Sequence, residues 1–511
     1  MKKIFGTISF FALLCVLSCS KNIDVTNDFA ELAPSKNDLD AGAWKPVLLA
    51  APDEFPVAPP AAPNTPSYAA EVNEIKGWQA GLTAAQKQSI RYWSAGAVLR
   101  WNEILRELVA KHNIPPYQNA DGTYPFPSAA NPFAYPVFPF SNPPYAARAY
   151  AYVSAAQYDA LIAAYHYKKL YNRAAPYTVE GVQALVPKTD LPSYPSEDAT
   201  VIGVTVELLK LLFPADQAFI QAKAEEHRRC RIMAGANVRS DMEAGEALGK
   251  AVAQKFTSHA RTDKAGAAIG TSLQWAELEA KTAATGEMPW VSQESPKRPP
   301  MLPLFGNVKT FLFDSATLIA IRPPAPPSTH SEQFKKELDE VMYYSKNYDR
   351  ERMRIVSFWA DGVNTYTPPG HWNAIAAEAF VAQQFSEVRW ARSMALLNMA
   401  MMDAAIACWD TKYLYFNPRP SQVDPAIKTL TGLPNFPSYT SGHSTFSGAA
   451  ASVLGHLIPS KAAAFDAMAA EASLSRLYGA IHYRSDCEQG LKCGQRVGSF
   501  AVERAKADGA E

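Results

Sequence analysis

A segment of this chain occurs twice, and the repeat constrains the fold more than any other feature of the sequence. When the sequence is shifted by 245 residues, the segment 192–249 falls on 437–494 without a gap. Identical residues then coincide at Pro192 and Pro437, Ser193 and Ser438, Arg231 and Arg476, and Arg239 and Arg484. Chance is a poor explanation for an ungapped match of this length, so the chain is predicted to contain two structural repeats.

Both halves consist mainly of alanine-rich stretches with helical periodicity. Apolar residues recur in them at intervals of three and four, and the strict alternation of a strand is scarce. The clearest stretches are residues 145–167, 201–213, 243–259, 373–409 and 444–457. The fold class is therefore predicted to be all-α, with two related helical bundles produced by an internal duplication.

Proline-rich segments indicate where the domains begin and end. A tether rich in proline and alanine is expected over residues 20–75, followed by an N-terminal helical bundle over 76–290. A second proline-rich segment, 291–345, is expected to connect this bundle to a C-terminal bundle over 346–511.

The first residues are typical of an export signal. Lys2 and Lys3 precede an apolar run that ends at Leu17 and is too short for an ordinary transmembrane helix. Val-Leu-Ser-Cys at 16–19 resembles a bacterial lipobox, so residues 1–19 are predicted to be a lipoprotein signal peptide with Cys19 as the acylated residue. Ordinary signal cleavage nearby is the alternative. The expected location is the bacterial cell envelope, in the periplasm or at the cell surface, with membrane contact only through the lipid anchor.

Charge and cysteine content argue against two classes of function. Lys+Arg and Asp+Glu both number 49, so a basic surface for nucleic acid is not indicated. The six cysteines form no CxxC pair and no ligand-spaced cluster with histidine, which argues against a zinc site. Cys487 and Cys493 could form a local disulfide, but Met242 and Leu248 stand at these places in the first copy and favour buried thiols.

Three short motifs near the C-terminus concentrate positive charge, hydroxyl and imidazole groups within residues 412–486. Two guanidinium groups and an ammonium group would offset the charge of a multiply charged oxyanion, and a Ser-Gly pair would donate further hydrogen bonds to it. Two histidines remain for chemistry near neutral pH. The candidate residues are Lys412, Arg419, Ser441, Gly442, His443, Arg476 and His482.

The local sequence indicates how the first two motifs lie. Lys412 is expected in the last turns of a helix that Pro418 ends, with Arg419 just beyond it. Ser441 and Gly442 are expected at the N-terminus of the next helix, where unpaired N–H groups favour an anion. Ser441 could instead serve only as the N-cap of that helix.

The third motif contains a histidine with a carboxylate four residues later. On a helix His482 and Asp486 would share a face, and the carboxylate would fix the imidazole tautomer. The other ring nitrogen would then be available as a nucleophile or a ligand. Arg476 lies six residues before His482, which requires either a helix break near Gly479 or a side chain that reaches around the helix.

The two copies differ at the positions that carry this chemistry. The corresponding pairs are Glu197 and Gly442, Asp198 and His443, and Asn237 and His482. The first copy thus lacks both histidines and places two acids where an anion would sit. One functional site is therefore expected, in the C-terminal bundle, and its counterpart is expected to be closed, with Arg231 in an internal salt bridge.

Taken together, the three motifs resemble those of the superfamily of type-2 phosphatidic-acid phosphatases and vanadium-dependent haloperoxidases. The spacings Lys-x6-Arg-Pro, Ser-Gly-His and Ser-Arg-x5-His-x3-Asp are all present and unbroken. The resemblance implies vanadate as the cofactor of a haloperoxidase. The residues that would hold this oxyanion are Lys412, Arg419, Ser441, Gly442, Arg476 and His482.

The resemblance also implies a role for each group that takes part in the chemistry. His482 would be the apical vanadate ligand, or the phosphorylated nucleophile in a phosphatase, and Asp486 would orient it. His443 would be the general acid–base. Lys412 would polarise peroxide.

Within the superfamily the chain is more similar to the soluble haloperoxidases. Trp409 and Phe436 fall where fungal vanadium chloroperoxidases carry Trp and Phe beside the halide. The alternative is that both are core aromatics, because Tyr165 stands at the place of Trp409 in the first copy. Asp361 resembles a haloperoxidase residue that supports a vanadate-binding arginine.

The resemblance leaves three functions open. A vanadium-dependent haloperoxidase would oxidise halide with hydrogen peroxide and halogenate a small organic acceptor. An acid phosphatase with the same residues would act on a soluble phosphomonoester through a phosphohistidine at His482. A non-catalytic oxyanion-binding lipoprotein would keep the site without turnover.

Overall fold

The structure, a computed structural model, describes residues 29–114, 142–295 and 297–511 and divides the chain into two units, Met1–Ala30 and Glu31–Glu511. The helices belong to the second unit, and the described residues contain no strand, which confirms the predicted all-α class. None of the described helices is long and apolar enough to cross a membrane. The predicted signal peptide and Cys19 lie outside the described residues, so the lipid anchor stays a prediction.

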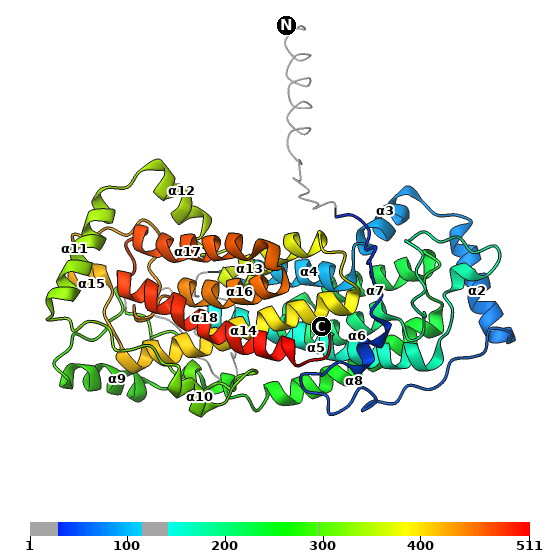
Figure 1. Cartoon of the computed structure of the whole chain (residues 1–511), viewed down its shortest axis with the longest axis horizontal. Helices are drawn as coiled ribbons and strands as arrows, with labels where there is room; N and C mark the ends of the chain where they lie inside the picture. Colours follow the sequence, from blue (N-terminus) through cyan, green and yellow to red (C-terminus); the bar gives the residue numbers. More distant parts are fainter. Residues whose placement is uncertain (1–28, 115–141, 296) are drawn as a thin grey trace, which may run out of the picture. The chain divides into compact units, whose positions relative to one another are not determined.

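The helices fall into two sets that follow one another along the chain (Figure 1). The first set is α2 (Pro66–Gln79), α3 (Ala84–Trp93), α4 (Ala97–His112), α5 (Pro143–Tyr171), α6 (Glu197–Leu212), α7 (Gln217–Met233) and α8 (Arg239–Ala260). The second set is α11 (Glu332–Lys346), α12 (Arg350–Phe358), α13 (Thr367–Val381), α14 (Glu387–Tyr415), α16 (Gly442–Leu457), α17 (Ala462–Tyr478) and α18 (Arg484–Lys506). Short elements connect them, namely α9 (Ser272–Ala284), α10 (Ser315–Ala320), α15 (Pro420–Val423) and the 3-10 turns η1 (Leu39–Ala43), η2 (Pro176–Thr178), η3 (Pro214–Asp216), η4 (Ala265–Ala267), η5 (Phe305–Asn307) and η6 (Pro459–Lys461).

The two sets are copies of one another, as the sequence repeat predicts. Helices α5 and α14 both have 29 residues, and both end at a residue in the left-handed conformation, Asn172 and Phe416. Helices α6 and α16 have 16 residues each, and α7 and α17 have 17. The bounds of α6 and α7 fall on those of α16 and α17 under the shift of 245 residues. The predicted duplication is confirmed.

Within each repeat, glycines allow two inner helices to pack in close contact. A Cβ added at Gly249 of α8 would lie 2.2 Å from the carbonyl oxygen of Thr200 in α6. A Cβ added at Gly494 of α18 would lie 2.1 Å from the carbonyl oxygen of Thr445 in α16. Only glycine permits this approach. The duplicated glycines therefore fix the distance between α6 and α8 in the first repeat and between α16 and α18 in the second.

The two repeats meet along α5 and α14, the equivalent long helices of the two copies, which pack against each other. A chain of buried amides and a hydroxyl crosses this boundary. Asn102 donates to Asn373 at 2.8 Å, Asn373 and Asn398 bond each other, and Asn398 donates to Ser154 at 2.9 Å. A buried polar network whose members are satisfied disfavours sliding of one repeat against the other.

The proline-rich segment before α2 is not a tether over its whole predicted length of 20–75. From Glu31 onward it packs on the second unit, and its backbone N–H groups at residues 47–49 donate to the carboxylate of Asp159 in α5 at 2.6–3.0 Å. Asp38 pairs with Arg389 at 2.8 Å. The physical reason is that the carboxylate of Asp159, buried in the middle of α5, needs hydrogen-bond donors, and the backbone of residues 47–49 supplies them.

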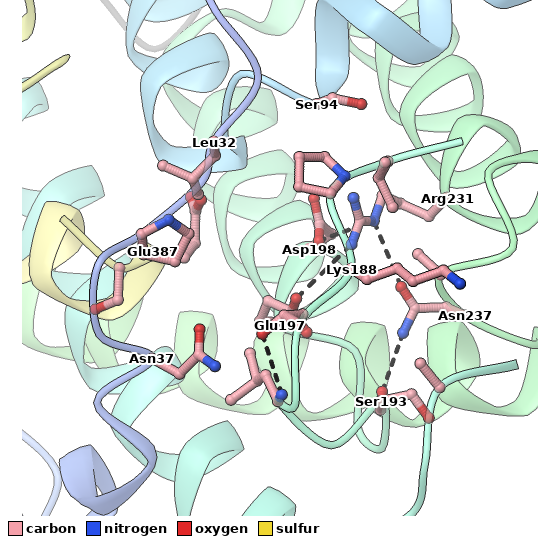
Figure 2. A pocket seen from close by; sticks show the side chains of 18 of the residues that line it. Leu32, Asn37, Ser94, Lys188, Ser193, Glu197, Asp198, Arg231, Asn237 and Glu387 are labelled. Carbon is pink, nitrogen blue, oxygen red and sulfur yellow. Dashed lines mark hydrogen bonds and ion pairs between the residues drawn. The ribbon is translucent and has the colours of Figure 1, made fainter. Parts of the chain in front are cut away.

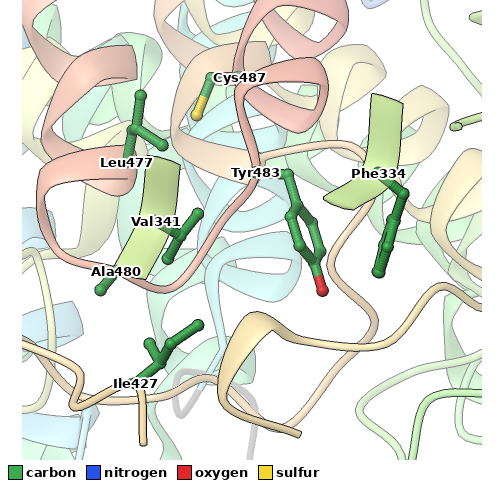
Figure 3. Close-up of a cluster of buried hydrophobic side chains, with 7 residues drawn as sticks. All are labelled: Phe334, Val341, Ile427, Leu477, Ala480, Tyr483 and Cys487. Carbon is green, nitrogen blue, oxygen red and sulfur yellow. The ribbon is translucent and has the colours of Figure 1, made fainter. Parts of the chain in front are cut away.

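The predicted connection 291–345 also ends too late, because it includes α10 and almost all of α11. Helix α11 packs on the turn between α17 and α18, where Phe334 and Val341 contact a buried cluster that includes Leu477 and Tyr483 (Figure 3). The second repeat therefore begins at α11, the counterpart of α2. The four described cysteines, Cys230, Cys408, Cys487 and Cys493, are buried and free, as the comparison of the copies favours.

The close helix contact predicts a clear difference between two glycine substitutions. Gly494→Ala forces Cβ against the Thr445 carbonyl, so we expect it to lower the free energy of unfolding by about 2–4 kcal/mol. Gly77→Ala, in exposed α2 with no atom within 4 Å of the added Cβ, should raise it by up to about 1 kcal/mol. Urea denaturation of both variants measures the two effects, and equal stabilities would contradict the packing argument.

Candidate active site

The predicted motif residues converge in the second repeat from four separate elements. Lys412 lies in the last turn of α14, and Arg419 precedes the single turn α15. Ser441 is the residue before α16, and Arg476 lies in the last turn of α17. His482 lies in the turn between α17 and α18.

The turn between α17 and α18 settles the two local questions about the third motif. Helix α17 ends at Tyr478 with Gly479 as its C-cap, so the predicted helix break is confirmed and brings Arg476 and His482 to one cavity. His482 and Asp486 do not share a helix, because α18 begins only at Arg484. Asp486 is instead the third residue of α18, and its carboxylate accepts from the N–H of Tyr483 at 3.1 Å in a capping box.

His482 is held in one tautomer by its neighbours. Its Nδ1 lies 2.9 Å from Asp486 Oδ2, and its Nε2 lies 3.0 Å from Nη1 of Arg419. Because a guanidinium group can only donate, Nε2 must accept, and Nδ1 carries the proton that is donated to Asp486. Burial and the charge of Arg419 hold the pKa of His482 well below its ordinary value, so the imidazole is neutral with its Nε2 lone pair toward the cations.

Lys412, Arg419 and Arg476 are three buried cations, and none forms an ion pair with a carboxylate of the described residues. Burial lowers the pKa of Lys412 to about 7, and lowers the pKa values of Arg419 and Arg476 to about 10. Nη2 of Arg419 is buried without a hydrogen-bond partner in the described part of the chain. Since isolated buried charges are costly, this arrangement calls for an anion.

Lys412 also shapes the loop that leads into α16. Its ammonium group donates to three carbonyl oxygens, those of Pro437, Ser438 and Thr440, at 2.8, 3.0 and 2.5 Å. All three of its protons are therefore used by the backbone in this structure. The charge of Lys412 acts on the cavity, while its hydrogen bonds position the loop that precedes Ser441.

The start of α16 combines a helix cap with open space. The hydroxyl of Ser441 accepts from the N–H of Ser444 at 3.3 Å, so Ser441 is the N-cap of α16. A Cβ added at Gly442 would meet no atom nearer than 3.8 Å, where it would approach Trp409. Gly442 therefore leaves room for a ligand at the positive end of the α16 dipole.

His443 faces the same cavity, and its Nε2 has no hydrogen-bond partner among the described residues. Burial and the charge of Arg476 hold its pKa well below the ordinary histidine value. Asp361 Oδ2 lies 3.8 Å from this Nε2, and Asp361 Oδ1 lies 3.0 Å from Nδ1 of His371. Asp361 was expected to support an arginine. It forms no ion pair with Arg476, but its charge favours the protonated form of Arg476 against the effect of burial, and its two oxygens also lie near His443 and His371.

Trp409 and Phe436 line the cavity next to the cations. Their ring centroids are 5.0 Å apart, with Lys412 Nζ 4.9 Å and Arg419 Cζ 5.1 Å from the centre of the Phe436 ring. The cavity measures about 230 Å³ and reaches from His482 and His443 past these aromatic rings. The rings are thus not only core aromatics, because they form one wall of the cavity.

Sequence reasoning missed Ser438, Met301 and Phe446. The hydroxyl of Ser438 donates to Asp486 Oδ2 and so helps to orient His482. Its identity with Ser193 in the first copy made it look like part of the scaffold. Met301 and Phe446 line the cavity, and no motif around them indicates this role.

The counterpart in the first repeat has the predicted salt bridges but is not closed. Arg231 lies 3.0 Å from Asp198 (Figure 2). Lys168 lies 2.6 Å from Glu197. Asn237 lies two residues before α8, as His482 lies two residues before α18, so the predicted equivalence is confirmed. These residues nevertheless line a cavity of about 330 Å³, because the side chains pair along its wall and do not fill it.

The described residues thus combine an all-helical fold with a cavity next to three buried cations, and comparisons with known proteins show which solved structures share this fold. Residues 392–505, which contain all three motifs, match the family model of the PAP2 superfamily, which confirms the resemblance. No curated protein sequence matches the chain.

Two solved bacterial structures are similar in fold. One is described as the first bacterial vanadium-dependent iodoperoxidase. Its sequence is 23% identical to this chain, the TM-score is 0.58, and the match covers 79% of this chain and 95% of that one. A holo-type bacterial vanadium-dependent chloroperoxidase is 13% identical with a TM-score of 0.51, and the match covers 75% of this chain and 96% of that one. The chain therefore has the fold of these haloperoxidases.

The residues of the cavity fit a tetrahedral oxyanion such as vanadate. Two polar atoms here, Nη2 of Arg419 and Nε2 of His443, are buried and unpartnered in the described residues. His443 lines the cavity, whereas Arg419 does not line it and contacts His482 Nε2 at 3.0 Å. The three cations supply charge, and Gly442 supplies space at a helix N-terminus. The residues that would hold the group are Arg419, Gly442, Arg476 and His482, with Lys412 behind them.

The pKa of Lys412 predicts how anion affinity depends on pH. A bound anion stabilises the protonated amine and raises its pKa above the value of about 7 in the free protein. The affinity for the anion should therefore be highest and constant below pH 7. Above pH 7 it should fall by up to about tenfold per pH unit, until the pH reaches the pKa of Lys412 in the anion complex.

Sulfate is a suitable probe, because its own charge is constant over this range. Calorimetric titration from about pH 6 to about pH 9 measures the slope. In Lys412→Arg protein the charge is permanent, so the slope should vanish. An equal slope in both proteins would show that another group titrates.

Proposed function

We propose that the protein is a vanadium-dependent haloperoxidase that oxidises halide with hydrogen peroxide. The observation that carries this proposal is the set of three buried cations near the Nε2 lone pair of His482, next to the aromatic wall of Trp409 and Phe436. None of the three forms an ion pair with a carboxylate of the described residues. The PAP2 match over residues 392–505 supports the anion site. The similarity in fold to an iodoperoxidase supports the choice of chemistry.

Vanadate, when bound, supplies a Lewis-acidic centre that activates hydrogen peroxide toward halide. The protein's own residues hold and orient the reactants. Neutral His482 directs its Nε2 into the cavity because Asp486 holds the other nitrogen. Arg419 and Arg476 offset negative charge, which is strongly stabilising in a buried site.

His443 is suited to move the proton of the incoming peroxide. It faces the cavity with a free Nε2 and a depressed pKa, so it is unprotonated and can act as a base near neutral pH. Asp361, 3.8 Å away, then stabilises the imidazolium that forms. Trp409 and Phe436 restrict water near the cations and offer ring edges, whose partial positive charge suits a halide ion.

A phosphatase that acts on a soluble phosphomonoester is the second candidate, because the same superfamily match and the same neutral His482 support it. In this reaction His443 first takes a proton from water, favoured by the negative charge of the bound phosphoester. His482 Nε2 then attacks phosphorus and displaces the alkoxide, which the His443 imidazolium protonates. Water hydrolyses the phosphohistidine to inorganic phosphate, and the neutral His443 accepts the proton of that water. A non-catalytic oxyanion-binding lipoprotein is the third candidate, and it has no support beyond the inactive first copy.

Protein loaded with orthovanadate is expected to halogenate an activated β-diketone when given peroxide and iodide, bromide or chloride. His482→Ala should lower this rate by at least about 100-fold, because it removes the imidazole that would bind the oxyanion. Asn237→Ala, at the equivalent place in the first repeat, is the matched control and should keep the rate within about twofold.

The assay separates the three candidates. Equal halogenation by the His482→Ala protein would overturn the proposal. Release of phosphate from a chromogenic monoester without vanadium, with inhibition by vanadate and no halogenation, would select the phosphatase. Tight binding of vanadate with neither activity would select the binding protein.

A further inference from the structure

The first repeat has kept a cavity at the place where the second repeat has its active site. Its residues Glu197, Asp198, Arg231 and Asn237 line this cavity, as their counterparts Gly442, His443, Arg476 and His482 line the other. Tyr165 and Leu191 take the places of Trp409 and Phe436. With about 330 Å³ the cavity has the volume of a small-molecule site, although nothing in the proposed reaction uses it.

The charges of this cavity are the reverse of those in the active site. The two cations at equivalent places are each neutralised, Lys168 by Glu197 at 2.6 Å and Arg231 by Asp198 at 3.0 Å. His227 also binds Asp198, at 2.9 Å. Neither of these two cations is left for an oxyanion, and Lys188, which also lines the cavity, is an exposed residue.

Two further carboxyl groups lie in the cavity wall: that of Asp190, an exposed residue that accepts from Asn37, and that of Glu387, the first residue of α14, which is buried. Its side chain is 7% exposed, and Oε1 accepts from the backbone N–H of Val98 at 2.5 Å. Oε2 has no hydrogen bond or ion pair with the residues that the structure describes. Glu387 is thus a buried acid with one unpartnered oxygen at the cavity, on the side of Leu32 and Asn37 in Figure 2.

The surroundings of Glu387 favour positive charge. Burial and the neighbouring charge of Asp198 raise its pKa to about 8, against the opposing effect of Arg231. A cation next to Oε2 would relieve both effects by pairing with the carboxylate. Trp93, Tyr165 and Tyr177 add aromatic walls, which attract cations and apolar groups.

A metal ion does not fit this cavity as well as an organic cation. Across residues 29–114, 142–295 and 297–511 no three His, Cys, Asp or Glu side chains are grouped so as to hold a metal ion. The cavity is also much larger than one ion, and much of its wall is apolar or aromatic. A primary ammonium ion with an apolar or aromatic substituent matches both its charge and its walls.

We propose that the cavity of the first repeat is a second ligand site, which takes a small organic ammonium ion beside Glu387. The duplicated scaffold then holds an anion in one repeat and a cation in the other. This site includes none of the residues proposed for catalysis, so its test is independent of the proposed function.

Benzylammonium is the probe, with the uncharged benzyl alcohol as its matched control. Calorimetric titration of the full chain is expected to give a dissociation constant of about 1 mM or tighter for benzylammonium and at least about tenfold weaker binding of the alcohol. Glu387→Gln keeps an acceptor for Val98 but cannot ionise, so it cannot form the carboxylate that a bound ammonium ion stabilises, and should weaken benzylammonium binding by about tenfold. Halogenation activity should not change in this variant.

If the Glu387→Gln variant is unstable, a crystal structure of the unaltered protein with benzylammonium provides the test. The ammonium group of the probe is expected next to Glu387 Oε2. Three results would each overturn the proposal. They are equal affinity for the alcohol, unchanged affinity in a folded Glu387→Gln protein, and bound benzylammonium outside this cavity or absent from the crystal.

Discussion

Three positive charges are buried in the second repeat without a carboxylate partner, and the design of the site depends on them. Removing an ion from water costs on the order of several kcal/mol, so the scaffold must hold these groups in place while no anion compensates them. It does so with backbone carbonyls: three accept from Lys412, and those of Phe436 and Ile481 accept from Arg419. The remaining donor capacity is directed to the cavity.

In the first repeat the same helical scaffold holds the equivalent cations in ion pairs with carboxylates. Glu197 and Asp198 replace a glycine and a histidine at the start of the equivalent helix, and they neutralise Lys168 and Arg231 within the protein. The glycine contacts between the inner helices are the same in both copies. The helical framework therefore fixes where the cavity lies, and a few residues at helix ends decide which charge it accepts.

Much of this was predictable from the sequence, for identifiable reasons. The repeat and the helical period predict two bundles, and charged residues at motif spacing predict which side chains meet around His482. The sequence did not reveal the hydrogen bonds that Lys412 makes to the backbone, nor that Asp361 lies beside His443 and His371, because both depend on loop paths. It misplaced the tether for a similar reason: Asp159 binds that segment through backbone N–H groups, which leave no side-chain pattern.

The central claim is that the carboxylate-free cations around His482 form a site for an oxyanion, and a crystal soaked with orthovanadate tests it most directly. Anomalous scattering locates vanadium without reference to any assumed chemistry. The account predicts one strong peak within bonding distance of His482 Nε2, with Arg419 and Arg476 on the surrounding oxygens, and no peak beside Asn237. A cavity at His482 without vanadium, or a peak in the first repeat, would contradict it.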